Sequence, residues 1–133
     1  MKVRRDRNAD LALLDLSVEY VEKAIATCDR DRSLRCRFLM DKAELLERRA
    51  THSDANTEQD YETARDTIKL AMHEISPEDT AMGKRTEYQA RLALTCLRLG
   101  NLRKSMDDYL EAIINLQQAI QATPGSSRLG HAP

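Results

Sequence analysis

Histidines and adjacent carboxylates are the residues of this chain whose types suit acid–base or metal chemistry. The three histidines are dispersed: His52, His73 and His131. Two acidic pairs occur, Glu78-Asp79 and Asp107-Asp108, but adjacent side chains on a helix point about 100° apart and do not converge on one reacting atom. Acidic residues near a helix start offset the helix dipole instead. His73-Glu74 alone supplies too few ligands for a metal.

Sequence motifs of common catalytic sites do not occur in the chain. It contains no HExxH motif, no glycine-rich phosphate loop and no nucleophile elbow. We therefore expect no catalytic residue, no bound metal and no cofactor.

The chain has three cysteines, Cys28, Cys36 and Cys96, without CxxC spacing. An odd number of cysteines suits a reducing compartment better than a disulfide framework. Cys28 and Cys36 flank a turn and could face each other across a hairpin, which leaves a disulfide or redox role as the less favoured alternative to free buried thiols. No apolar run reaches the 18 or so residues of a membrane span, and no signal-peptide pattern occurs. We expect a cytoplasmic protein.

Opposite charges are nearly balanced over the 133 residues, with 21 Lys and Arg against 22 Asp and Glu and a net charge of −1. Such a chain has no long-range attraction for nucleic acid or for acidic membranes, so neither is an expected partner. The basic residues within 1–7 are expected to form a flexible, solvated end without a role of their own.

Apolar residues recur at three- and four-residue spacing, and only four glycines and three prolines interrupt them. This pattern predicts an all-α domain of about five helices. Asn8 or Asp10, Ser33, Thr57, Ser76 and the Gly100-Asn101 turn mark the expected starts. One helical domain is expected over 8–123, with a disordered tail over 124–133.

Two boundary signals lie around the expected fourth helix. Ser76 with Asp79 approximates a capping box, and Pro77 suits the first helical turn. Gly83 lies inside this expected helix and is a weak point, because interior glycine costs about 1 kcal/mol relative to alanine. We expect the helix to continue through Gly83 to Leu99 and the chain to turn at Gly100-Asn101.

One segment of the chain is echoed by another. Residues 60–71 and 101–112 place a polar residue and then small, large and small residues at matching offsets, 41 positions apart. Small residues at fixed offsets let helices approach closely. On that basis Ala112→Leu is expected to destabilise the domain by about 1–3 kcal/mol through overpacking.

The last expected hairpin resembles the tetratricopeptide repeat family. The positions that carry the resemblance are Leu92-Ala93, Gly100-Asn101-Leu102, Ser105, Tyr109 and Ala112. The resemblance implies antiparallel helix hairpins stacked as a short right-handed solenoid of about two and a half repeats. The repeats are long, since 47 residues separate Ala24 from Ala71 and 41 separate Ala71 from Ala112, against about 34 in the family. A chain that begins with a second-helix pattern also looks like part of a larger array.

In that family a concave groove is lined by the first helix of each hairpin, which points to ten residues here. They are Arg37, Met40, Glu44, Glu47, Arg48, Glu87, Ala90, Leu94, Leu97 and Arg98. The alternative for Leu94 and Leu97 is simple burial, because their helix is apolar almost all round. A carboxylate clamp of the chaperone-binding type is disfavoured, because Met40 and Glu44 stand at the matching places.

The resemblance implies a non-catalytic scaffold or adaptor that binds a peptide or helix of a protein partner. The alternative is a helical assembly or regulatory module, which self-associates or belongs to a larger protein. The identity of the partner stays open. Leu94→Glu and Arg98→Glu are expected to weaken partner binding without unfolding the domain.

Overall fold

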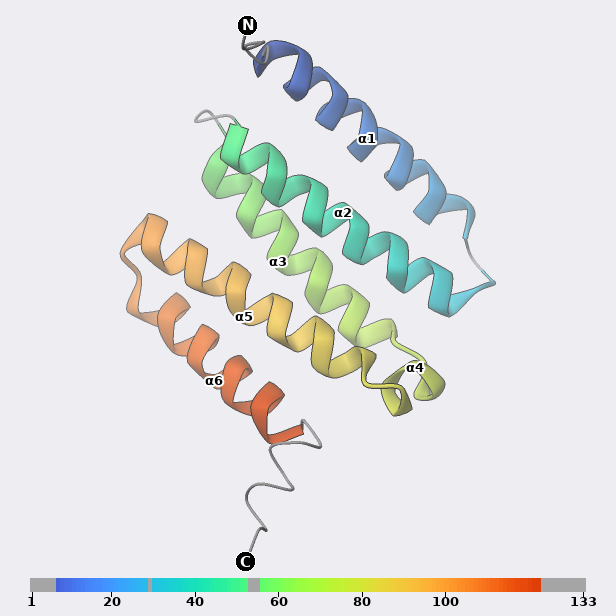
Figure 1. Cartoon of the computed structure of the whole chain (residues 1–133), viewed down its shortest axis with the longest axis vertical. Helices are drawn as coiled ribbons and strands as arrows, with labels where there is room; N and C mark the ends of the chain where they lie inside the picture. The colour runs from blue at the N-terminus through green and yellow to red at the C-terminus, as the bar shows by residue number, and fades with distance from the viewer. Residues whose placement is uncertain (1–6, 29, 53–55, 123–133) are drawn as a thin grey trace, which may run out of the picture.

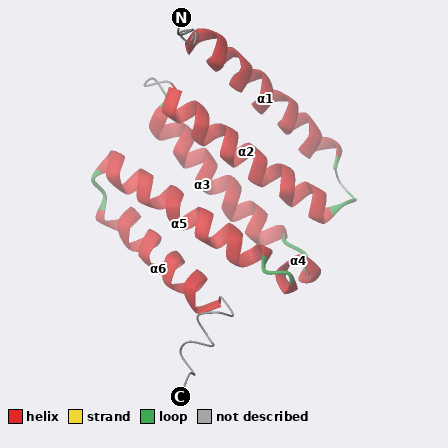
Figure 2. Cartoon of the chain, viewed as in Figure 1, coloured by secondary structure: helices red, strands yellow, loops and turns green. Residues whose placement is uncertain are grey.

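A computed structural model describes residues 7–28, 30–52 and 56–122 of the chain. The expected tail at 124–133 and all but Arg7 of the expected basic end lie outside this part. All of its regular structure is helical (Figure 2), as expected. The helices are α1 (Arg7–Thr27), α2 (Arg32–His52), α3 (Thr57–Glu74), α4 (Pro77–Ala81), α5 (Lys84–Arg103) and α6 (Met106–Ala122).

The five long helices lie side by side with alternating direction (Figure 1). In chain order α1 packs on α2, α2 on α3, α3 on α5, and α5 on α6, while the short α4 packs on α5. Figure 1 shows α1 and α6 at opposite ends of this row. Each of these end helices therefore has one side that no other described helix covers.

The prediction of one helix from Pro77 to Leu99 was wrong, because α4 and α5 replace it. Gly83 has φ 83°, in the left-handed region, and there the chain changes direction between α4 and α5. This conformation is costly for residues with a Cβ and not for glycine. The predicted start was right: Ser76 Oγ accepts a hydrogen bond from the Asp79 amide at 3.1 Å, and Pro77 opens α4.

The predicted turn at Gly100-Asn101 was also wrong, because α5 continues to Arg103. Lys104 takes the left-handed conformation, with φ 55°, and Ser105 Oγ accepts a hydrogen bond from the Asp108 amide at 3.3 Å at the start of α6. The segment 101–112 is therefore not one continuous helix, because residues 101–103 belong to α5 and residues 106–112 belong to α6. Only 106–112 is the helical counterpart of 65–71 within α3.

At the start of α2 the capping residue differs from the expected one. Asp31 Oδ1, rather than Ser33, accepts a hydrogen bond from the Leu34 amide at 3.0 Å. The helix then runs to His52.

Small residues bring the helices close together. Ala43, Ala64 and Ala71 are completely buried within one core that combines side chains of α1, α2, α3, α5 and α6. Larger members of this core include Leu39, Ile68, Leu92 and Cys96. The close packing expected from the small-residue pattern is confirmed at Ala64 and Ala71.

Gly100 is needed for close packing rather than for a turn. A Cβ at this position would lie 2.8 Å from the ring of Tyr109 on α6, closer than packed side chains allow. We expect Gly100→Ala to lower the free energy of unfolding by about 1–3 kcal/mol, because α5 and α6 must move apart. Urea denaturation measures this change. An unaltered midpoint would show that the ring moves aside freely.

Candidate functional site

An apolar groove lies between α5 and α6, with a volume of about 470 Å³. Its walls are formed almost entirely by carbon atoms. The lining residues are Ala90, Ala93, Leu94, Leu97, Tyr109, Ala112, Ile113 and Leu116. The polar end of Tyr109 is engaged, since its hydroxyl donates a hydrogen bond to Asn101 Oδ1 at 2.7 Å. The groove therefore offers contact area to apolar side chains and no charged group.

The two sides of α6 carry different kinds of side chain. Its buried residues are small or polar: Asp108, Ala112 and Ala119. Its large apolar residues face outward, and Ile113, Leu116 and Ile120 are each 50% exposed. Exposed apolar residues at three- and four-residue spacing form the kind of stripe with which helices pack on one another.

The groove has a covered counterpart inside the same chain. Four residues lie 41 positions before the four α6 residues of the groove: Ile68, Ala71 and Met72 of α3, and Ile75 directly after its end. Ile68 and Ala71 are 0% exposed, in a core that residues of α2, α3 and α5 share, and α5 packs on α3. The same surface is thus covered by a helix in one hairpin and open in the next.

The helix that covers the first surface shows what such a surface accepts. The buried residues of α5 are spaced mainly three and four apart: Tyr88, Leu92, Ala93, Thr95, Cys96, Leu99 and Gly100. Tyr88, Leu92, Cys96 and Leu99 follow one another at three- and four-residue spacing along one side of the helix, whereas Ala93 and Gly100 lie on the side toward α6. A helix with one continuous apolar face is therefore the natural occupant of the open groove.

Glu47 connects α2 to α5 through a buried carboxylate that is only 3% exposed. It accepts hydrogen bonds from Arg91 Nη2 at 2.6 Å, Arg98 Nη1 at 2.9 Å and Thr95 Oγ1 at 2.8 Å. Both Glu47 and Arg98 were expected to face a partner, but they are engaged with each other. A glutamate at position 98 would repel Glu47, so we now expect Arg98→Glu to lower stability, contrary to the sequence-based expectation.

The other expected groove residues fall into separate places. Ala90, Leu94 and Leu97 come together on one wall of the apolar groove. Glu87 is exposed, and its Oε2 lies 3.5 Å from Lys84 Nζ.

Arg37 and Met40 line a different hollow of about 560 Å³, which also includes Asp79, Lys84 and Tyr88. Glu44 and Arg48 pair with each other at 2.9 Å and line a third hollow, between α1 and α2. The expected continuous groove is therefore divided.

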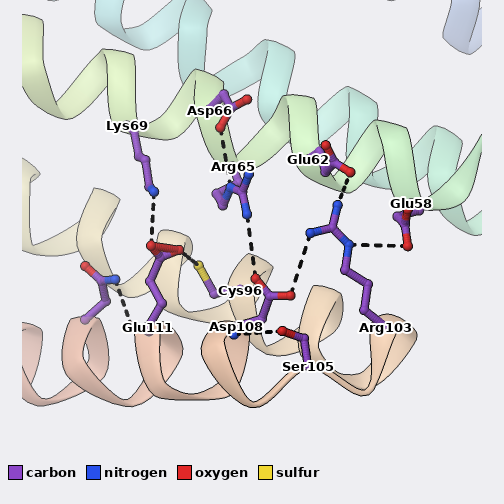
Figure 3. Close-up of polar contacts among 11 residues, drawn as sticks. Glu58, Glu62, Arg65, Asp66, Lys69, Cys96, Arg103, Ser105, Asp108 and Glu111 are labelled. Atoms are coloured by element: carbon purple, nitrogen blue, oxygen red, sulfur yellow. Dashed lines mark hydrogen bonds and ion pairs between the residues drawn. The ribbon is translucent and has the colours of Figure 1, made fainter.

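A network of charged residues fixes α6 against α3 (Figure 3). Arg65 Nη1 lies 3.6 Å from Asp108 Oδ1, and Lys69 Nζ lies 3.0 Å from Glu111 Oε2. Arg103, at the end of α5, pairs with Glu62 of α3 and with Asp108. These contacts hold the polar side of α6 inward, so its apolar side is presented outward.

The three cysteines have no disulfide partner, and the thiol of Cys96 is not activated. Cys28, Cys36 and Cys96 are all free, as expected, and the last two are buried. Burial and a 3.1 Å hydrogen bond to Glu111 Oε1 raise the pKa of Cys96 to about 12. The thiol is therefore protonated at neutral pH, which is opposite to the state of a reactive cysteine.

No protein-family model, curated protein sequence or solved structure matches this chain. Within residues 7–28, 30–52 and 56–122, no group of three or more His, Cys, Asp and Glu could hold a metal ion. None of the helices described is long and apolar enough to cross a membrane. The function is therefore inferred from the groove itself.

Proposed function

We propose that this chain is a non-catalytic protein–protein interaction module, whose groove between α5 and α6 binds an amphipathic helix of a protein partner. The observation that carries the proposal is the relation between the two hairpins. Ile68 and Ala71 are completely buried in the core that α2, α3 and α5 share, whereas Tyr109 and Ala112, 41 positions later, line an open groove. A helix laid into this groove would repeat a contact that the chain already makes.

The lining residues indicate the chemistry of the partner. Glu47 lies four residues after the buried Ala43 and binds two arginines of α5. At the corresponding place, four residues after Ala93, the open groove has Leu97. An arginine of the partner placed beside Leu97 would lose its hydration without gaining a hydrogen-bond acceptor. The partner is therefore expected to present aliphatic or aromatic side chains to the groove.

We also propose that the chain belongs to the tetratricopeptide repeat family. The antiparallel pairs α2–α3 and α5–α6, and the packing of α5 on α3, support an array of stacked hairpins. On this proposal the bound helix takes the place of the next first helix of the array. We further propose a cytoplasmic adaptor with protein rather than nucleic-acid or membrane partners, supported by the balanced charge of the chain.

Self-association or a regulatory role within a larger protein is the second candidate function. The observation that favours it lies on α1, at the other end of the row. Leu13, Leu16 and Tyr20 are exposed along the outer side of this helix, so both ends of the described structure present apolar side chains.

The proposal is tested by selecting ligands from a displayed library of amphipathic helical peptides with the wild-type protein. We expect the selected peptides to carry apolar residues at three- and four-residue spacing. Leu97→Glu should weaken their binding by about 100-fold, because it places a charge among apolar side chains. Fluorescence anisotropy measures the dissociation constants.

Leu70→Glu is the matched control. Leu70 is 40% exposed on α3 and Leu97 is 43% exposed on α5, so both substitutions add the same charge at similar exposure, but only Leu97 lines the groove. Circular dichroism checks that both variants stay folded. Equal loss of binding in the two variants, or failure to select any helical peptide, would reject the groove as the binding site.

A further inference from the structure

We infer that the groove is occupied by a second copy of this chain, in a twofold dimer in which α6 of each protomer packs into the α5–α6 groove of the other. This inference rests on the proposed function, because it names the helix that the groove binds. In such an interface the same surface of both protomers takes part. That surface must therefore contain both a groove and an apolar helix that fits it.

The outer side of α6 supplies the required helix. Met106, Ile113 and Ile120 recur at seven-residue intervals, and Tyr109 and Leu116 stand three residues after the first two. This is the spacing with which helices pack in coiled coils. The covered counterpart in the chain, the cleft closed by α5, likewise holds a helix with apolar residues at three- and four-residue spacing.

The apolar surface around the groove is large for the exposed face of a monomer. Six large apolar residues on the α5 wall and the outer stripe of α6 are 38–68% exposed: Leu94, Leu97, Met106, Ile113, Leu116 and Ile120. Together they expose on the order of 500–600 Å², at the upper end of the roughly 300–600 Å² of the largest apolar patch of a typical monomer and most of the roughly 800 Å² per partner in a standard interface.

The distribution of charge along α6 favours an antiparallel arrangement. The exposed acidic residue of this helix is Asp107, because Asp108 and Glu111 pair with Arg65, Arg103 and Lys69 on its inward side, and no charged residue occurs from Ala112 to Ala122. A twofold axis perpendicular to α6 near Ile113 places Asp107 of each helix beside the uncharged end of the other. A parallel arrangement would bring the two Asp107 side chains together.

Other segments of this chain fit the groove less well. On α1 the stripe is shorter, with Leu13, Leu16 and Tyr20 exposed, and Lys23 Nζ lies 5.4 Å from the centre of the Tyr20 ring. If α1 of one protomer packed into the groove of the next, every such complex would still have one free groove and one free α1. Association would then continue into open chains of protomers. Residues 123–133 contain a single large apolar residue, Leu129, and so cannot supply a stripe.

The test is size-exclusion chromatography with light scattering on the full chain, from micromolar to millimolar concentration. We expect a dimer for the wild type and a monomer for Ile113→Glu, with the dissociation constant raised by at least about 100-fold. Leu16→Glu, a matched substitution on the exposed side of α1, should remain a dimer. Circular dichroism should show unchanged helix content in both variants, because both positions are about half exposed.

Three results would overturn the inference. A dimer that persists in Ile113→Glu would place the interface elsewhere. Association that continues beyond a dimer and is abolished by Leu16→Glu would show head-to-tail pairing of α1 with the groove. A wild-type protein that is monomeric at every concentration would exclude a second copy as the occupant, while peptide binding sensitive to Leu97→Glu would still support the proposed function.

Discussion

Replacing Glu47 by alanine is expected to lower the free energy of unfolding by about 3–5 kcal/mol. The substitution removes the acceptor of three hydrogen bonds between α2 and α5, at distances of 2.6–2.9 Å. It leaves Arg91 and Arg98 close together without their shared carboxylate, and it opens a cavity where the side chain was buried. Urea denaturation followed by circular dichroism measures the change.

Glu44→Ala is the control for this prediction. Glu44 lies one turn earlier on α2, its side chain is 48% exposed, and it pairs only with Arg48 on the same helix among the contacts described for it. Exposed pairs of this kind contribute roughly 0.3–0.5 kcal/mol. If both substitutions cost the same, Glu47 would not be the residue that joins α2 to α5.

Ile68→Ala is expected to destabilise the protein by about 2–5 kcal/mol. Ile68 is completely buried in the core that α2, α3 and α5 share, so its truncation leaves a cavity in the covered cleft. This result would show that the surface equivalent to the open groove is stabilised by a helix packed on it. Thermal or urea denaturation of the purified variant provides the measurement.

Leu70→Ala is the control on the same helix. Leu70 lies two residues further along α3 and is 40% exposed, so its truncation is expected to cost less than about 1 kcal/mol. A small effect at Ile68, similar to that at Leu70, would mean that α5 does not pack tightly on α3.

The fold was largely predictable from local signals in the sequence, and the errors arose where tertiary contacts decide. The spacing of apolar residues predicted the helices, and Ser76 with Pro77 predicted where α4 begins. Gly83 was recognised as a weak point, but a cost of about 1 kcal/mol does not by itself separate a weakened helix from a broken one. Gly100 was read as a turn, whereas it lies within α5 and makes room for the ring of Tyr109.

One wall of the groove was predictable and the other was missed. The family resemblance led to Ala90, Leu94 and Leu97, which do line the groove. The α6 wall was missed because periodicity shows that a helix has an apolar stripe but not that a second, small-residue stripe will be the buried one. Glu47 was placed in the groove because nothing local shows that Arg91 and Arg98, 44 and 51 positions later, will reach it.

Methyl NMR of the leucine and isoleucine residues tests most directly whether the α5–α6 groove binds a helix. The protein would be titrated with a peptide from the helix selection at a concentration below any self-association. We predict chemical-shift changes concentrated at Leu94, Leu97, Ile113 and Leu116, and unchanged signals at Leu13 and Leu70. Changes centred on α1 or α3, with the four groove residues unaffected, would contradict binding in the groove.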